Sequence, residues 1–140
     1  MAKSGRRLSK TFLIYIIVAT LFGCGGGGPT ETSSGSESLP PKILSWQPPT
    51  KFLDNSPLDP VKDLSRFEIF INKDGVFSEA DNEMAAVSAA DSASGQVATT
   101  FNLANLAPFL SKGVTYHVSI RAVCMTGLKS GFSPSANFSF

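Results

Sequence analysis

The sequence predicts an all-β fold, an antiparallel β-sandwich that follows a signal peptide and a disordered linker. Three observations from residue 39 onward support this prediction: short apolar runs, alternation of apolar and polar residues within them, and turn-forming residues between them. We therefore divide the chain into a signal peptide (residues 1–23), a cysteine with a linker (residues 24–38) and one folded domain (residues 39–140).

The first segment has the features of a secretory signal. Residues 1–10 carry four of the twelve basic side chains, and residues 11–22 are uncharged and mostly apolar. A bilayer-spanning helix needs about 20 apolar residues, so this run better suits the apolar region of a signal peptide. After cleavage, eight basic and eleven acidic side chains remain. This balance argues against nucleic-acid binding, which needs a basic surface.

The apolar run ends in Leu21-Phe22-Gly23-Cys24, which resembles the lipobox of bacterial lipoproteins. The resemblance implies cleavage before Cys24, lipid on its thiol, and anchoring to a membrane of the bacterial envelope. Gly25 follows the cysteine, which implies the outer membrane in a diderm host. Phe22 departs from the small residue usual at its position. An uncleaved anchor and an ordinary signal with a chance cysteine are the alternatives.

A linker is predicted between the cysteine and the domain. Residues 25–38 are rich in Gly, Ser and Thr and contain no large apolar side chain. Such a segment cannot bury enough apolar surface to fold, so we expect a flexible tether. A Gly/Ser-rich chain of this length has a typical end-to-end distance of about 20 Å. The tether would keep the domain near the membrane and free to reorient.

Five segments of the domain have the pattern of β-strands, at residues 42–46, 66–72, 97–103, 115–125 and 133–140. Pro48-Pro49 must end the first, because proline cannot donate to a ladder. The sequence Asn72-Lys73-Asp74-Gly75 provides a turn after the second. Residues 84–90 fit either a helical turn or a weak edge strand.

Several motifs follow one another over about residues 39–140: Leu44-Ser45-Trp46-Gln47-Pro48-Pro49, Asp54-Asn55-Ser56-Pro57-Leu58, Leu64-Ser65-Arg66-Phe67-Glu68-Ile69-Phe70, Leu106-Ala107-Pro108, and Gly113 followed by Tyr116, Val118 and Ile120. Their order resembles that of bacterial fibronectin type III domains. The resemblance implies two packed antiparallel sheets with a core of Trp46, Phe67, Ile69, Tyr116, Val118 and Ile120. The chain departs from the family in a barely visible first strand, in Asn55 at a turn glycine, and in a longer loop at residues 109–112.

Alternation within two of the strands identifies a candidate binding face on the outward side of the sheet. It consists of Arg66, Glu68, Phe70, His117 and Arg121. Phe70 would be its apolar centre. The alternative is that these residues only stabilise the sheet through cross-strand pairs, such as Glu68 with Arg121.

The side chains that could support catalysis are few. His117 is the only histidine, and no cysteine or carboxylate lies near it at the spacing of a ligand set. Nucleophilic catalysis needs a base beside Ser or Cys. We therefore predict no enzyme, no cofactor and no metal site. Cys124 is predicted in the core as a small apolar residue. Acidic residues at 54–63 and 74–83 are predicted to be solvated, with weak calcium binding as the alternative.

Together these features predict a lipid-anchored envelope protein whose domain is a non-catalytic protein-interaction module. The expected partners are the membrane, through Cys24, and another envelope or surface protein. The alternative is a carbohydrate or cell-wall binding module. Sugar sites usually stack the ring on exposed Trp or Tyr, whereas Trp46 and Tyr116 are predicted in the core, which disfavours this alternative.

Overall fold

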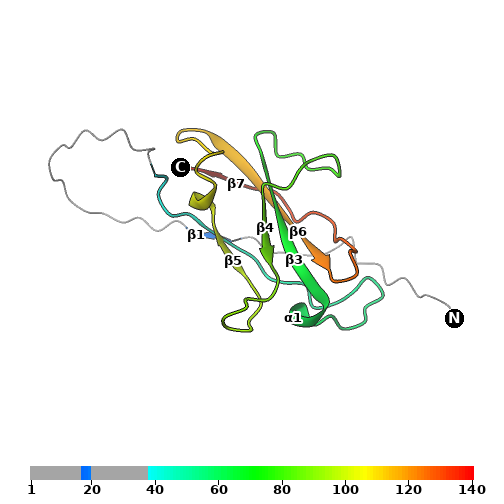
Figure 1. Cartoon of the computed structure of the whole chain (residues 1–140). Coiled ribbons are helices and arrows are strands. Elements are labelled where there is room, and N and C mark those ends of the chain that lie inside the picture. The colour runs from blue at the N-terminus through cyan, green and yellow to red at the C-terminus, as the bar shows by residue number, and fades with distance from the viewer. Residues whose placement is uncertain (1–16, 20–37) are drawn as a thin grey trace.

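The computed structural model describes residues 17–19 and 38–140. The described chain is mostly β-strand and forms two antiparallel sheets, which confirms the predicted all-β class. One sheet has three strands in the order β1-β2-β5, and the other has four in the order β4-β3-β6-β7 (Figure 1). The predicted lipidation at Cys24 and the tether up to residue 37 lie outside the described residues.

Two long strands dominate the four-stranded sheet. β3 (Leu64–Asn72) and β6 (Thr115–Cys124) pair along most of their length. The other elements are β1 (Ile17–Ala19), β2 (Ile43–Ser45), α1 (Pro60–Asp63), β4 (Ala85–Ser88), β5 (Thr100–Asn102), the 3₁₀ turn η1 (Leu103–Leu106) and β7 (Ala136–Ser139). Four of the five predicted strand segments contain one of these strands, and the fifth, residues 66–72, lies within β3, which begins two residues earlier.

The structure decides between the two alternatives for residues 84–90 and shortens the strand predicted at residues 97–103. Residues 84–90 contain β4, which pairs with β3, so the edge-strand alternative is the right one. The segment at 97–103 holds only the short β5, so the predicted strand is too long. It ends because Asn102 Oδ1 accepts a hydrogen bond from Ala104 N at 3.0 Å and starts η1 there.

The core lies between the two sheets. Trp46 and Phe67 meet there with ring centroids 5.2 Å apart, which connects the end of β2 to β3. Leu44 and Leu103 are fully buried beside them. The six core residues predicted by the family resemblance are all buried: Trp46, Phe67, Ile69, Tyr116, Val118 and Ile120. That part of the prediction is confirmed.

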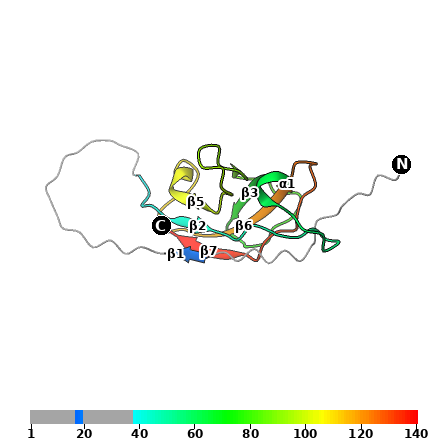
Figure 2. The ribbon, with the colours of Figure 1, turned by 90° about the horizontal axis from the view of Figure 1, so that it is seen from below.

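The helical turn α1 connects a loop to the start of β3. Asp59 Oδ1 accepts a hydrogen bond from Val61 N at 3.0 Å, and Pro60 occupies the first helical turn. Both residue types favour a helix start at these positions. Figures 1 and 2 show α1 at one end of the domain and the C-terminus at the other.

β1 lies inside the predicted signal peptide. It pairs antiparallel with β2, with Val18 opposite Leu44. The strand therefore occupies the sheet edge where the sequence of the domain itself shows barely any first strand. Cleavage before Cys24 would remove β1 from the processed protein.

The loop before β6 is held by the Tyr116 hydroxyl. Ser111 N donates a hydrogen bond to Tyr116 Oη at 3.0 Å. This bond from a tyrosine near the start of a strand to the backbone a few residues upstream is the arrangement known as a tyrosine corner. The longer loop at residues 109–112 therefore accommodates it.

We predict that Tyr116→Phe lowers the free energy of unfolding by about 0.5–1.5 kcal/mol, the net value of one hydrogen bond. The ring still fills its place in the core, so only the bond to the backbone is lost. Urea unfolding followed by the fluorescence of Trp46, the only tryptophan, measures the change. An unchanged midpoint would show that the bond does not stabilise the loop.

Candidate functional site

A buried ion pair joins the two central strands on the sheet face turned away from the core. Glu68 and Arg121 stand opposite each other in the ladder of β3 and β6. Arg121 Nε donates to Glu68 Oε2 at 2.7 Å, which confirms the predicted cross-strand pair. The side chain of Glu68 is fully buried, and that of Arg121 is only 5% exposed.

Two further cations bind the same carboxylate. Arg66 Nη2 donates to Glu68 Oε1 at 2.6 Å, and Lys129 Nζ donates to Glu68 Oε2 at 3.2 Å. Burial alone would raise the pKa of the Glu68 carboxyl, but the hydrogen bonds from Arg121, Arg66 and Lys129 outweigh it and lower the pKa to about 2. Glu68 is therefore ionised throughout the physiological pH range.

Aromatic rings enclose the guanidinium of Arg121. Its central carbon lies 4.9 Å from the ring centroid of Phe70 and 5.1 Å from that of Phe132. The rings of Phe70 and Phe132 also meet edge to face, with centroids 5.0 Å apart. Such cation–π contacts gain strength when the cation is removed from water.

The predicted binding face is therefore covered rather than exposed. Glu68, Phe70 and Arg121 are buried, and Arg66 and His117 are half-buried. Two loop segments cover this face of the sheet. Phe132, after β6, packs on Phe70, and Glu79, after β3, accepts a hydrogen bond from Arg121. The expectation that Phe70 is the apolar centre of an exposed face is wrong.

His117 packs against a turn, and Cys124 is buried in the domain. A side-chain carbon added at Gly75 would lie 2.9 Å from His117 Nδ1, so the ring packs against the glycine backbone of the turn after β3. Cys124 is free and 3% exposed at the end of β6. Burial, with a smaller contribution from the charge of Asp63, raises the pKa of its thiol, which favours the protonated form.

The acidic loops use their carboxylates to fix backbone turns. Asp54 Oδ1 accepts from Ser56 N at 2.9 Å, and Asp74 Oδ1 accepts from Val76 N at 3.0 Å. Asp81 Oδ2 accepts from Ser78 N at 2.6 Å. Within residues 17–19 and 38–140, no three His, Cys, Asp or Glu side chains are grouped as a metal site would require.

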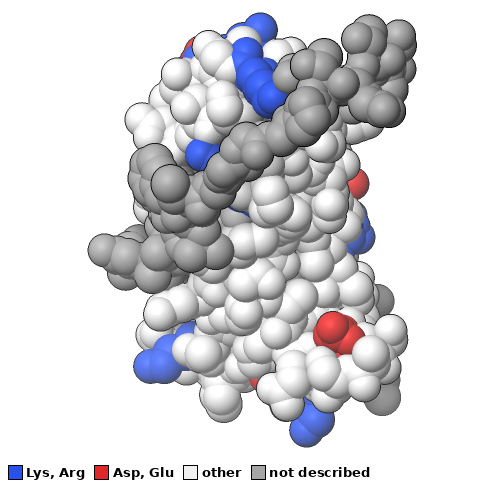
Figure 3. Space-filling view, turned by 90° about the vertical axis from the view of Figure 1, so that its left-hand side faces the viewer, with Lys and Arg blue, Asp and Glu red and all other residues white. Residues whose placement is uncertain are grey.

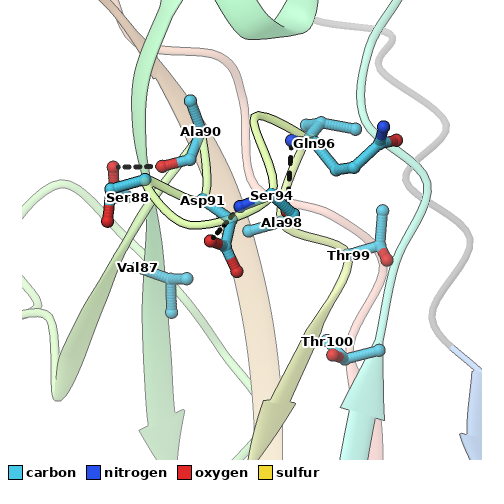
Figure 4. A pocket seen from close by; sticks show the side chains of 11 residues that line it. Val87, Ser88, Ala90, Asp91, Ser94, Gln96, Ala98, Thr99 and Thr100 are labelled. Atoms are coloured by element: carbon cyan, nitrogen blue, oxygen red, sulfur yellow. Dashed lines mark hydrogen bonds between the residues drawn. The ribbon is translucent and has the colours of Figure 1, made fainter.

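An open pocket of about 490 Å³ lies between the ends of β4 and β5 (Figure 4). Its lining is made of small residues from segments 87–100, chiefly Ser, Thr, Ala and Val. The carboxylate of Asp91 accepts hydrogen bonds from Ala93 N and Ser94 N, so it supports the local turn. No aromatic ring lines the pocket on which a sugar could stack, and Trp46 and Tyr116 are buried elsewhere.

Exposed apolar side chains occur in the loop before α1, in α1 itself and in the turn after β6. They are Leu53, Val61, Met125 and Leu128, with exposures of 42%, 37%, 66% and 36%. Leu53 precedes α1, Val61 lies in it, and Met125 follows β6. The hydrogen bond from Met125 N to Asp63 O, at 2.9 Å, holds α1 and the turn after β6 side by side. We call these four residues the apolar end. Sequence alternation could not identify it, because all four lie outside the strands.

The chain enters the domain at the opposite end. Lys42, just before β2, donates to the carbonyl of Ser139 near the C-terminus. The loop before β6 is there as well, since Gly113 N donates to Phe140 O at 3.1 Å. Phe109 in this loop is 68% exposed. The tether predicted before the domain would therefore leave the apolar end as the far end of the domain.

No family model, curated protein or solved structure matches the chain. Among the described residues, none of the helices has the length and apolar composition to cross a membrane.

Proposed function

We propose that the protein is a lipid-anchored component of the bacterial envelope, with a fibronectin type III-like domain that acts as a non-catalytic protein-interaction module. The observation that carries the interaction role is the apolar end. Its four exposed apolar side chains come from the loop before α1, from α1 and from the turn after β6, and the hydrogen bond from Met125 N to Asp63 O holds α1 beside that turn. Exposed apolar residues scattered singly are normal, whereas a gathered group favours a protein contact.

The strand order supports the fibronectin type III-like assignment. In that fold the second and fifth strands share one sheet, while the third, sixth and seventh share the other. β2 and β5 are neighbours in the first sheet, and β3, β6 and β7 are neighbours in the second. The bond between Ser111 and Tyr116 adds a second family feature.

The lipid anchor rests on the N-terminal sequence, in which a basic segment, a short apolar run and Leu21-Phe22-Gly23-Cys24 occur in the order of a lipoprotein signal. A single acyl chain binds membranes only marginally, but two or more give stable attachment. Processing at Cys24 would place the domain on a membrane by a tether, with the outer membrane as destination in a diderm host.

We predict that a photoreactive amino acid at Met125 or at Leu128 captures the same envelope protein in living cells. Adding Val61→Glu to either variant should abolish the capture, because it places a charge within the apolar end. Mass spectrometry of the crosslinked products measures both results. Phe109 provides the matched control for Met125, since it is 68% exposed against 66% for Met125 but lies at the tether end.

Capture of the same protein from Phe109 with equal yield would contradict this proposal. So would the absence of a recurrent protein from both Met125 and Leu128 when the lipidated protein is present on the membrane. The crosslinking sites avoid Phe70 and Arg121, because both are buried in the fold.

A further inference from the structure

The outer edge of β2 is the part of the fold that signal-peptide removal changes. β2 lies between β1 and β5 in its sheet. β1 belongs to residues 1–23, so processing at Cys24 makes β2 an edge strand. The inference therefore rests on the proposed lipid-anchored function.

Backbone hydrogen bonds show which residues of this segment face β5. The carbonyl of Lys42 accepts from Leu103 N at 2.8 Å, and Trp46 N donates to Thr99 O at 2.9 Å. Successive residues of a strand direct their backbone N–H and C=O groups alternately towards the neighbouring strand on one side and on the other. The even-numbered Lys42 and Trp46 direct theirs towards β5. The odd-numbered Ile43 and Ser45 therefore direct theirs away from β5.

In the full chain these groups are directed at β1. Ile43 stands opposite Ala19, and Ser45 stands opposite Ile17. Loss of β1 exposes two N–H and two C=O groups in a row. Such an edge is a template for pairing with another strand unless charges or prolines guard it.

The residues of β2 carry no charge. Ile43, Leu44 and Ser45 are uncharged, and the nearest residues of the types that oppose strand pairing are Lys42 on one side and Pro48 on the other. On the side of the domain shown in Figure 3, most of the visible described surface is uncharged, with Lys and Arg side chains towards its two ends and along one margin.

The sequence of β2 matches that of the strand it would lose. β1 reads Ile17-Val18-Ala19, and β2 reads Ile43-Leu44-Ser45. Both have isoleucine, a branched aliphatic residue and a small residue in that order. A second β2 can therefore replace β1 in the same antiparallel register, position by position.

We propose that two processed copies of the protein pair through β2, antiparallel and around a two-fold axis at Leu44. Ile43 of each copy then stands opposite Ser45 of the other, and the two pairs exchange four backbone hydrogen bonds. In the processed copies β2 and β5 remain of this sheet, so the pairing joins them into one continuous sheet across the dimer, in the order β5-β2-β2-β5. The contact is isologous and closes after two copies.

Membrane attachment favours this pairing. Three residues a side form a short contact, and each hydrogen bond contributes only about 0.5–1.5 kcal/mol net. Lipid anchors confine both copies to one surface, which raises their effective concentration without any new contact. The dimer is therefore expected on membranes rather than in dilute solution.

Energy transfer between labelled copies in one membrane tests the proposal. Ser92 is exposed in the loop between β4 and β5, so Ser92→Cys accepts a dye, whereas Cys124 is buried and does not. Acylated protein carrying donor or acceptor dye is reconstituted together into phosphatidylethanolamine–phosphatidylglycerol vesicles. We expect transfer above the level of random mixing, and its loss when excess unlabelled protein is added.

Two charge variants make the test specific to the β2 register. Ile43→Lys with Ser45→Lys places like charges opposite each other in both pairs and should weaken association by about tenfold or more. Ile43→Lys with Ser45→Glu places opposite charges in the same pairs and should restore the transfer. Unchanged Trp46 fluorescence in both variants establishes that the domain is folded.

The intact mass of each sample separates the two proposals. Cleaved, acylated protein that shows only random transfer, or equal transfer in both charge variants, overturns β2 pairing and leaves the lipid anchor standing. Protein that retains residues 1–23 without acyl groups overturns both, since β1 then still covers β2. Cys24→Ala provides this uncleaved form as a control and should show no transfer.

Discussion

Replacing Glu68 with glutamine is expected to lower the free energy of unfolding by about 3–5 kcal/mol, the usual cost of breaking a buried ion pair from one side. The Glu68 carboxylate is fully buried and accepts hydrogen bonds from Arg121, Arg66 and Lys129. The neutral amide of glutamine cannot compensate the positive charges of these three side chains. Arg121 would remain buried between Phe70 and Phe132 with only the exposed carboxylate of Glu79 as partner. Urea unfolding measures the loss.

Two further variants distinguish a buried charge from an ordinary surface pair. Glu79→Gln removes the other partner of Arg121, but that carboxylate is 77% exposed, so the loss should stay below about 1 kcal/mol. Glu68→Gln combined with Arg121→Met removes both buried charges and should recover much of the stability. Equal losses in Glu68→Gln and Glu79→Gln would contradict the network as described.

The same carboxylate gives the wild-type protein a defined acid sensitivity. Folding lowers the pKa of Glu68 from 4.5 to about 2, so between these values the unfolded chain binds more protons than the folded one. The stabilisation is fully present above pH 4.5 and is lost as the pH falls towards 2. This loss should be absent from Glu68→Gln.

Phe67→Ala is expected to destabilise the domain by about 3–5 kcal/mol, since it removes a large side chain from a closed core. Phe67 is fully buried in β3 and packs on Trp46 across the sandwich. A domain of this size has a total stability of about 5–15 kcal/mol, so the variant should be close to unfolding at 37 °C. Thermal unfolding by circular dichroism measures the shift.

Phe109→Ala is the matched control for Phe67→Ala. Phe109 is 68% exposed, and exposed substitutions usually change stability by less than about 0.5 kcal/mol. A loss for Phe67→Ala no larger than that for Phe109→Ala would place Phe67 outside the core.

The inward side of the fold could be predicted from the sequence, because burial between two sheets forces alternation along each strand. Tyr116, Val118 and Ile120 follow this rule and are buried as expected. The one-turn helix at residues 60–63 was not predicted, although Asp59 and Pro60 are a recognisable start signal. A single turn has no apolar periodicity, so the sequence pattern that identifies the strands does not identify this helix.

The outward side could not be predicted in the same way. Alternation identifies the side chains that point away from the core, but not what covers them. Glu68 and Arg121 are charged and suggest a solvent-facing row, yet Phe132 and Glu79 from flanking segments enclose them. The signal available was a surplus of phenylalanines, with Phe70 on an outward position and Phe77 and Phe132 in loops.

The intact mass of the protein extracted from cell membranes tests the lipid-anchored account most directly. We expect a chain that begins at Cys24 and carries a diacylglyceryl group and an N-acyl group. Cys24→Ala should instead retain residues 1–23 and carry neither addition. A wild-type mass without acyl groups, whether cleaved or not, would contradict the account.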